Sequence, residues 1–232
     1  MDAYRHASAV SFRPAVQCSS RVRAAARFET AHLPERFGLF IIIAIGETVV
    51  AMGTQAAGHE HVGLVVLGTL ALSFVLICTL WWTYFHFGAS AMRHALRTTP
   101  IQGRIVRDVF SYTHLAYVIG IICVAVGLKK LLAHPGALPH SVTELMLAPG
   151  AALYFAGFVY SRWRMFGAPT LFRTLTFALC LGIALLAPLL PLVATAAAVT
   201  GLAVALNLLE SFWVRSNRPL LLIPVPGHHR AG

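Results

Sequence analysis

Long apolar runs alternate with short polar segments along most of this chain. Each run is close to the roughly 20 residues that an α-helix needs to cross a bilayer. The pattern predicts an all-α, polytopic transmembrane helix bundle of about six spans, although the fourth run is short. The last two runs are separated by little more than Pro188 and Pro191, so a single helical hairpin with a tight turn is an alternative for them. The six runs are 36–56, 62–87, 109–133, 145–161, 171–190 and 192–213.

The composition indicates a membrane protein independently of the runs. Of the 232 residues, 58% are hydrophobic and only 11% are charged, and the mean hydropathy is +0.74. A soluble domain carries about 25% charged residues. The net charge of +10 does not indicate nucleic-acid binding, because the basic residues occur in short clusters between apolar runs. We therefore expect a multi-pass protein whose surroundings are lipid, with no nucleic-acid partner.

The distribution of basic residues predicts the orientation. Sixteen of the 18 Lys and Arg residues lie in segments that alternate spans place on one side, and only Lys129 and Lys130 lie on the other. The positive-inside rule then makes both termini cytoplasmic, and we expect the protein in the bacterial inner membrane. Trp81, Trp82, Tyr84, Tyr160 and Trp163 lie at the cytoplasmic helix ends, where an interfacial aromatic belt is expected.

Three regions are predicted along the chain. Residues 1–30 form an Arg-rich leader, residues 31–214 a six-helix membrane domain, and residues 215–232 a short cytoplasmic tail. The leader has no apolar core of seven or more residues, so it is not a secretory signal. A transit peptide and a disordered cytoplasmic segment both fit its composition.

Glu47 is the most unusual residue of the first apolar run. It lies eleven residues past Arg36, which is roughly 16 Å along a helix and close to the middle of a ~30 Å hydrocarbon layer. An acid at that depth costs at least ~2.5 kcal/mol to insert, so it should face protein or water. We expect Glu47 to point into the bundle, with Gly46 and Gly53 on a neighbouring face that another backbone can approach closely.

Other polar groups cluster toward the cytoplasmic side. His86, Asp108 and His114 lie within the inner turns of the second and third helices, and Asn207 and Glu210 near the end of the last one. Together with Glu35 and Arg36, they can line an approach that leads to Glu47. A structural interpretation is equally open: Glu47 as hydrogen-bonded glue between helices, and the charged residues as anchors at helix ends. The ion or proton path candidates are Glu47, Glu35, Arg36, Asp108, His114 and His86.

No pattern in the chain indicates an enzyme. There is no Gly-rich phosphate loop, no Gly-x-Ser-x-Gly and no His-Glu-x-x-His. The four cysteines have no paired spacing, and the His59-Glu60-His61 loop needs no metal to explain it. We expect no enzymatic activity, no cofactor and no metal site.

Two segments carry a family resemblance. The stretch from His32 to Phe40, HLPERFGLF, continues through an apolar run into Gly46-Glu47. It closely resembles the HLxERFGLFxIIxLGE pattern of the bacterial low-temperature-requirement A family. The segment Arg107–Leu115, RDVFSYTHL, is similar to a second characteristic region of that family. The resemblance covers about residues 32–215 and implies an integral membrane protein, but it transfers no biochemical mechanism.

Members of that family are usually longer, with further membrane spans before the ERFGLF segment. The resemblance therefore implies that this chain matches the C-terminal part of such a protein. Either a homo-oligomer or partner helices can replace the additional spans, and an inactive truncated member is a further alternative.

Two functional hypotheses follow. In the first, the protein is an ion- or proton-coupled transporter or channel that uses Glu47. In the second, it is a non-catalytic membrane scaffold or assembly partner, in which Glu47 and Arg36 fix the register of helices.

Overall fold

The protein is a bundle of long helices, seen in a computed structural model that describes residues 33–58, 63–88 and 106–216. No strand occurs among these residues, and the predicted all-α fold is confirmed. Two π-helical segments extend the helices: η1 (Thr83–Gly88) follows α3 and η2 (Val106–Tyr112) precedes α6. The predicted leader and nearly all of the predicted tail lie outside the described residues. The long helices are α2 (Leu33–Ala57), α3 (Leu64–Trp82), α6 (Thr113–Ala133), α7 (Leu147–Phe166), α8 (Leu171–Leu186) and α9 (Leu192–Arg215).

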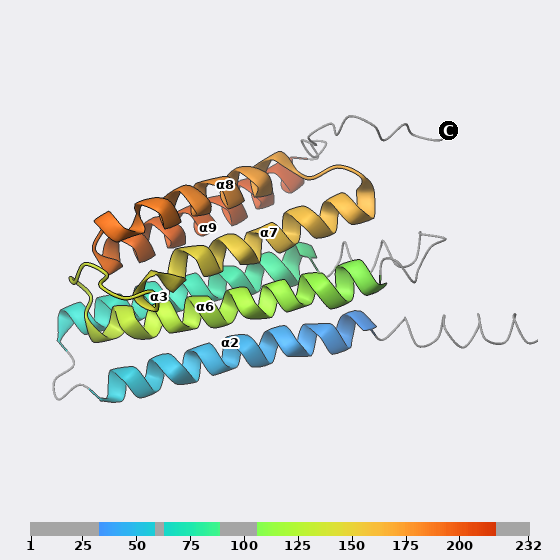
Figure 1. Cartoon of the computed structure of the whole chain (residues 1–232). Coiled ribbons are helices and arrows are strands. Elements are labelled where there is room, and N and C mark those ends of the chain that lie inside the picture. The colour runs from blue at the N-terminus through green and yellow to red at the C-terminus, as the bar shows by residue number, and fades with distance from the viewer. Residues whose placement is uncertain (1–32, 59–62, 89–105, 217–232) are drawn as a thin grey trace, which may run out of the picture.

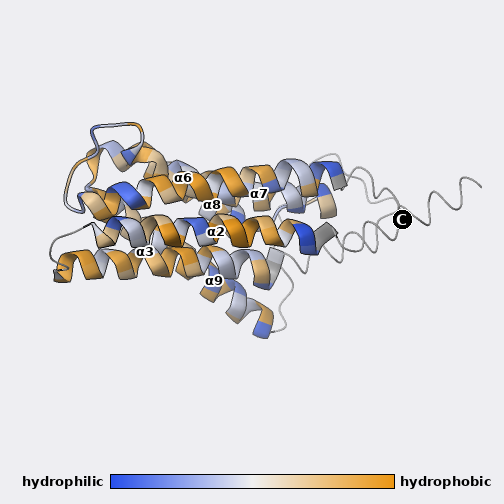
Figure 2. Cartoon of the chain, turned by 90° about the horizontal axis from the view of Figure 1, so that it is seen from below, coloured by the Kyte–Doolittle hydropathy of each residue, from blue (hydrophilic) through white to orange (hydrophobic). Residues whose placement is uncertain are grey.

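Successive helices run up and down the bundle, as Figure 1 shows. The start of α2 and the end of α9 lie at the same end of the molecule, which we call the inner end (Figure 1). This agrees with the even number of helices predicted from the sequence. The orientation predicted from the charge distribution would place this inner end on the cytoplasmic side. Hydrophobic residues cover the bodies of the helices (Figure 2).

Within the described residues, five helices are long and apolar enough to cross a membrane, and α7 is not among them. Its 20 residues include Gly, Ser, Tyr and Arg side chains that lower its hydropathy. Its most extensive contacts are with α6 and α8, and Ala148, Ala151, Tyr154 and Phe155 on it are fully buried. The short fourth run of the sequence therefore forms the helix that this bundle encloses most. The five apolar segments are Glu35–Ala57, Leu64–His86, Arg107–Ala133, Leu171–Leu189 and Leu192–Arg215.

Local sequence explains how the last three helices begin and end. Gly167 ends α7 with a φ of 74°, a left-handed conformation that glycine adopts without strain, and donates its N–H to the carbonyl of Trp163 at 2.9 Å. The 3-10 turn η4 (Ala187–Leu189) ends α8, and Pro191 precedes α9 with extended ψ. The last two runs therefore form two helices joined by a short turn, which is the helical hairpin given above as the alternative.

The closest helix contact in the bundle is between α6 and α7, and glycines make it possible. A Cβ atom added to Gly120 would lie 2.8 Å from the carbonyl oxygen of Gly150. One added to Gly127 would lie 2.5 Å from the Cβ of Leu147, and one on Gly157 would lie 2.6 Å from the ring of Tyr117. Real side chains do not approach so closely. Without hydrophobic driving force in lipid, this backbone approach supplies van der Waals contact between the two helices.

Aromatic side chains fill the core next to this contact, at the inner end. Tyr117 packs against Phe158 with ring centroids 4.6 Å apart and against Tyr84 at 5.8 Å. Tyr84 is 1% exposed, so its predicted place in the interfacial belt is wrong. Tyr84 is the second residue of η1, and its ring points toward Tyr117 in the core. Trp81, Trp82, Tyr160 and Trp163 are all exposed, as a belt requires.

The α6–α7 contact yields a stability prediction. Gly120→Ala should lower the free energy of unfolding by about 1–3 kcal/mol, because the added methyl group overlaps the backbone of α7. SDS titration of the detergent-solubilised protein, followed by circular dichroism, measures this. Gly46→Ala is the control: nothing lies within 4 Å of the added atom, so stability should stay equal or rise by up to about 1 kcal/mol. Equal effects of the two substitutions would contradict the close contact.

Candidate functional site

Glu47 lies in a groove between α2 and α6, on the outside of the bundle. The groove has a volume of about 360 Å³ and is lined almost entirely by apolar atoms. No hydrogen bond or ion pair joins the Glu47 carboxylate to the part of the chain that the structure describes, Lys129 of the same groove included. The lining residues are Phe40, Ile43, Ala44, Glu47, Thr48, Ala51, Val118, Ile122, Ala125, Val126 and Lys129.

The expectation that Glu47 points into the bundle of this chain is wrong. Helix α2 packs through Ile41, Thr48 and Met52, which are at most 2% exposed. Glu47 precedes Thr48 and projects about 100° away from it, which leaves its side chain exposed. The close backbone approach expected at Gly46 and Gly53 is also not found, since nothing described lies within 4 Å of a Cβ built there.

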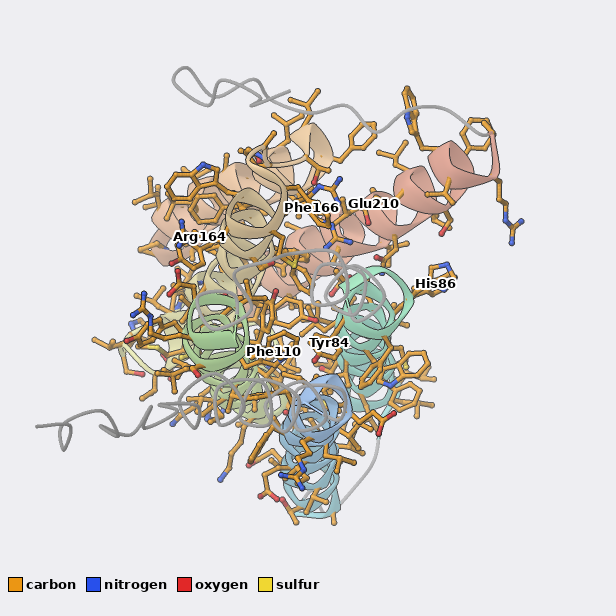
Figure 3. The ribbon with its side chains drawn as sticks, turned by 90° about the vertical axis from the view of Figure 1, so that its right-hand side faces the viewer. Tyr84, His86, Phe110, Arg164, Phe166 and Glu210 are labelled. Atoms are coloured by element: carbon orange, nitrogen blue, oxygen red, sulfur yellow. The ribbon has the colours of Figure 1, made fainter. Side chains whose placement is uncertain are left out.

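The predicted residues near the inner end are not gathered around Glu47, because none of them lines its groove. Glu35 and Arg36 are exposed in the first turn of α2. His86 is exposed at the outer edge of η1, where its ring meets that of Trp82 at 6.1 Å (Figure 3).

Asp108 is buried and forms two ion pairs. Its Oδ1 accepts a hydrogen bond from Arg107 at 3.0 Å, and its Oδ2 accepts from Nε of Arg164 at 3.1 Å and from Nη2 of the same residue. Arg164 lies on α7, so Asp108 connects the start of the third span to the end of the α7 helix. This arrangement supports the anchoring interpretation of Asp108.

His114 is 2% exposed and held in one orientation. Its Nδ1 lies 3.1 Å from the carbonyl oxygen of Val109, and its Nε2 lies 2.8 Å from the hydroxyl of Tyr84. A carbonyl only accepts, so the neutral ring carries its proton on Nδ1 and accepts the Tyr84 proton on Nε2. The ring of Phe37 on α2 packs against the His114 ring, with the two ring centroids 4.8 Å apart, so α2 covers His114.

A buried ion pair joins α8 to α9 at the inner end. Nε and Nη2 of Arg173 donate to the two carboxylate oxygens of Glu210 at 2.7 and 2.8 Å. Arg173 is 8% and Glu210 is 4% exposed. The guanidinium also lies over the ring of Phe158 at 4.7 Å. The two parallel hydrogen bonds give the guanidinium and the carboxylate a partner of opposite charge. A buried ion pair needs this, because no water is present to solvate either charge.

Sequence reasoning missed the role of Arg173. From the sequence, Arg173 was used only in the count of basic residues that predicts the orientation, and Glu210 was interpreted as an anchor at a helix end. The available signal was their depth: each is inside an apolar run, close to the same end of two antiparallel neighbours.

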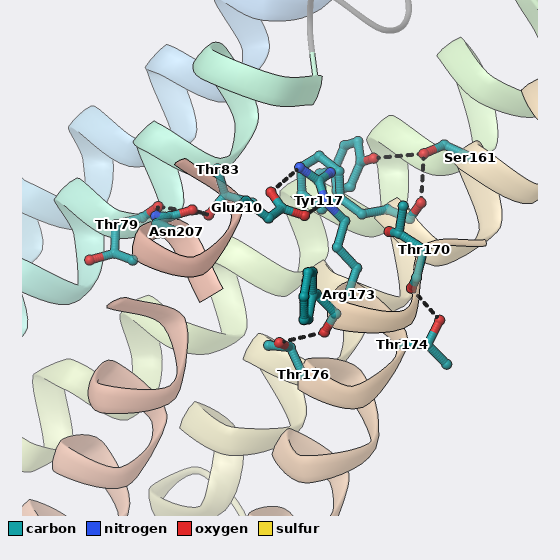
Figure 4. A network of polar contacts seen from close by, with 12 residues as sticks. Thr79, Thr83, Tyr117, Ser161, Thr170, Arg173, Thr174, Thr176, Asn207 and Glu210 are labelled. Carbon is teal, nitrogen blue, oxygen red and sulfur yellow. Dashed lines mark hydrogen bonds and ion pairs between the residues drawn. The ribbon is translucent and has the colours of Figure 1, made fainter. Parts of the chain in front are cut away.

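Further hydrogen bonds connect the inner core. Nδ2 of Asn207 donates to the carbonyl of Thr79 at 3.0 Å, and Thr83 donates its hydroxyl hydrogen to Oδ1 of Asn207 at 2.9 Å (Figure 4). The Tyr154 hydroxyl donates to the carbonyl of Leu80 at 2.7 Å. Asp108, His114, Asn207 and Glu210, which were expected to line the approach to Glu47, are therefore each hydrogen-bonded to other residues of the bundle.

Among residues 33–58, 63–88 and 106–216, no three His, Cys, Asp or Glu side chains come together as a metal site. The His59-Glu60-His61 loop lies outside these ranges.

The fold and composition define a class: a polytopic, all-α integral membrane protein with a buried polar core at one end. A family model described as "Bacterial low temperature requirement A protein (LtrA)" matches residues 7–208. The chain belongs to this family. It is similar to the uncharacterized protein RA0937 of Rhizobium meliloti (strain 1021), with 36% identity over 134 residues. The match covers 56% of this chain and 32% of the relative, so the chain spans about a third of that protein's length. No solved structure matches the chain.

The Arg173–Glu210 pair makes the second prediction. Glu210→Gln should lower the free energy of unfolding by about 3–5 kcal/mol, because it leaves the guanidinium buried without a counter-charge. Arg173→Met combined with Glu210→Leu should restore most of this loss, since no charge remains to be neutralised. The same SDS titration measures both. A double variant as unstable as the single one would show that packing, and not charge, dominates this site.

Proposed function

We propose that the chain is part of an ion- or proton-coupled membrane transporter or channel, and that a cation or proton contacts it in the Glu47 groove. One observation carries the proposal. Glu47 is at the middle of an apolar helix, in an apolar groove, and has no cationic partner among the described residues. Asp108 and Glu210, by contrast, are bound by arginines. An ionisable residue at membrane depth is a functional candidate by default.

The geometry suggests how the groove works. At membrane depth, a carboxylate between apolar walls is costly unless a positive charge or a proton neutralises it. A cation or a proton arriving from water supplies that neutralisation. When Glu47 alternates between its free and its neutralised state, positive charge moves along the groove. Glu35, Arg36 and His86 are exposed toward the inner end, where they are placed to adjust the local concentration of cations. The proposal requires no cofactor and no catalytic step.

A second candidate function is membrane assembly. The groove is lined almost entirely by apolar atoms, and the chain spans about a third of its curated relative's length. A helix from another copy or another chain would then cover the groove, with Glu47 hydrogen-bonded to it as a register-fixing group. In this case Glu47 contributes to stability and assembly instead of flux.

Proton and alkali-cation flux in proteoliposomes tests the two candidates. The transport proposal predicts flux through the 232-residue chain that Glu47→Gln reduces at least about tenfold, because the neutral amide cannot exchange a charge. Gel filtration in detergent checks that the variant folds. Glu144→Gln is the matched control: it removes the same charge from the loop before α7, which contributes no residue to the groove, and should leave flux unchanged.

Two results would count against the transport proposal. Unchanged flux in Glu47→Gln would remove Glu47 from the ion path. Absence of flux together with a loss of oligomer or of stability in Glu47→Gln would favour assembly.

A further inference from the structure

The inner ends of α7, α8 and α9 contain more positive charge than the described residues neutralise. Arg173 is paired with Glu210. Arg162 on α7 has a buried Nε without a hydrogen-bond partner, and its guanidinium stacks over the ring of Phe166, 5.0 Å from the centroid. That stacking fixes the plane of the guanidinium and with it the direction of its N–H groups.

Among the described residues, the acid that acts on Arg162 is Glu210, and Arg173 already binds both of its carboxylate oxygens. The chain has eight Asp and Glu residues. Asp108 is occupied by Arg107 and Arg164, and Glu144 accepts backbone N–H bonds in the loop before α7. Segments 89–105 and 217–232, which adjoin this end in the sequence, contain no Asp or Glu. Arg162 therefore shares the charge of Glu210 with Arg173, and a ligand can supply the negative charge that these two arginines lack.

Thr170 adds an independent indication of a ligand. It is 4% exposed, and its Oγ1 is buried with no hydrogen-bond partner. It occupies the N-cap of the 16-residue helix α8 without making the usual capping bond. The first N–H groups of a helix and its dipole favour an anion at this position. Figure 4 shows Thr170 beside Ser161 and Arg173.

The unsatisfied groups are concentrated at this end. Buried polar side-chain atoms without a partner occur at four described residues, namely Arg162, Thr170, Thr195 and Ser211. Three of them belong to the inner ends of α7, α8 and α9, and Ser211 directly follows Glu210. Buried donors are normally satisfied, so three in one region call for an unseen acceptor.

We propose that the inner ends of α7, α8 and α9 form a binding site for a phosphate group, held by Arg162, the Thr170 hydroxyl and the N-terminus of α8. A phosphate offers several strong acceptor oxygens and a charge that neutralises Arg162. The sequence-predicted orientation places this end at the cytoplasmic leaflet, where anionic lipids are concentrated. Two sources share the chemistry: the headgroup of an anionic phospholipid and a soluble phosphate compound.

The test uses the whole chain in two settings. In detergent, the midpoint of thermal unfolding is compared in sodium phosphate and in sodium chloride of equal ionic strength. In nanodiscs, it is compared between phosphatidylcholine alone and phosphatidylcholine with phosphatidylglycerol, and native mass spectrometry counts the lipid that stays bound. Stabilisation by phosphate alone identifies a soluble ligand, and stabilisation by phosphatidylglycerol only identifies a lipid headgroup.

Matched variants separate a built site from general attraction to negative charge. Arg162→Gln should weaken binding about tenfold, whereas Arg215→Gln, which removes the same charge from an exposed position at the end of α9, should not. Thr170→Val should weaken binding too, and Thr195→Val should not, although both threonines have an unpartnered hydroxyl. Circular dichroism without ligand checks that all four variants fold.

Three outcomes overturn the proposal. The first is that neither phosphate nor phosphatidylglycerol stabilises the wild-type chain. The second is equal weakening by Arg162→Gln and Arg215→Gln, which is the result for diffuse surface attraction. The third is unchanged binding in Thr170→Val. Because flux through the Glu47 groove is not part of these measurements, they remain informative whatever the result of the transport assay.

Discussion

The contact between α6 and α7 is the interaction on which the rest of the bundle depends. In lipid, helices gain little from hiding apolar side chains, so close packing and internal hydrogen bonds hold them together. Glycines at Gly120, Gly127 and Gly150 bring the two backbones together. This allows α7, which is less apolar than its neighbours, to lie inside the bundle and to present Tyr154 and Phe158 to the core.

The inner end follows a second constraint, which is that polar groups removed from water need partners. Tyr84 with His114, Asn207 with Thr83, and Arg173 with Glu210 meet this need in pairs that cross between helices. Each pair fixes the rotation of the two helices that carry it. Such groups stabilise one arrangement of the bundle among the many that apolar packing alone would permit.

Two places depart from this rule, and both suggest ligands. Among the described residues, Glu47 is at membrane depth without an ion pair, and Nε of Arg162 is buried without a hydrogen-bond partner. The two are at different positions in the bundle: Glu47 is in a groove on the outer face of α2 and α6, and Arg162 is near the inner ends of α7 and α8. A cation or proton at the first and a phosphate at the second are separate proposals that rest on separate observations.

The sequence alone determined the membrane class, the helical runs and their alternating direction, because hydropathy and charge are properties of each segment by itself. It also singled out Glu47 by its depth in the first apolar run.

The tertiary structure decided which neighbour each helix face meets. Thr48 packs inward while the adjacent Glu47 does not, and Tyr84 turns into the core although it follows exposed tryptophans. The depth of Arg173 and Glu210 in two apolar runs was a signal in the sequence, but their pairing was decided only by the packing of α8 against α9. A helix carries the same apolar stripe whether lipid or protein covers it, so its partners come only from the folded bundle.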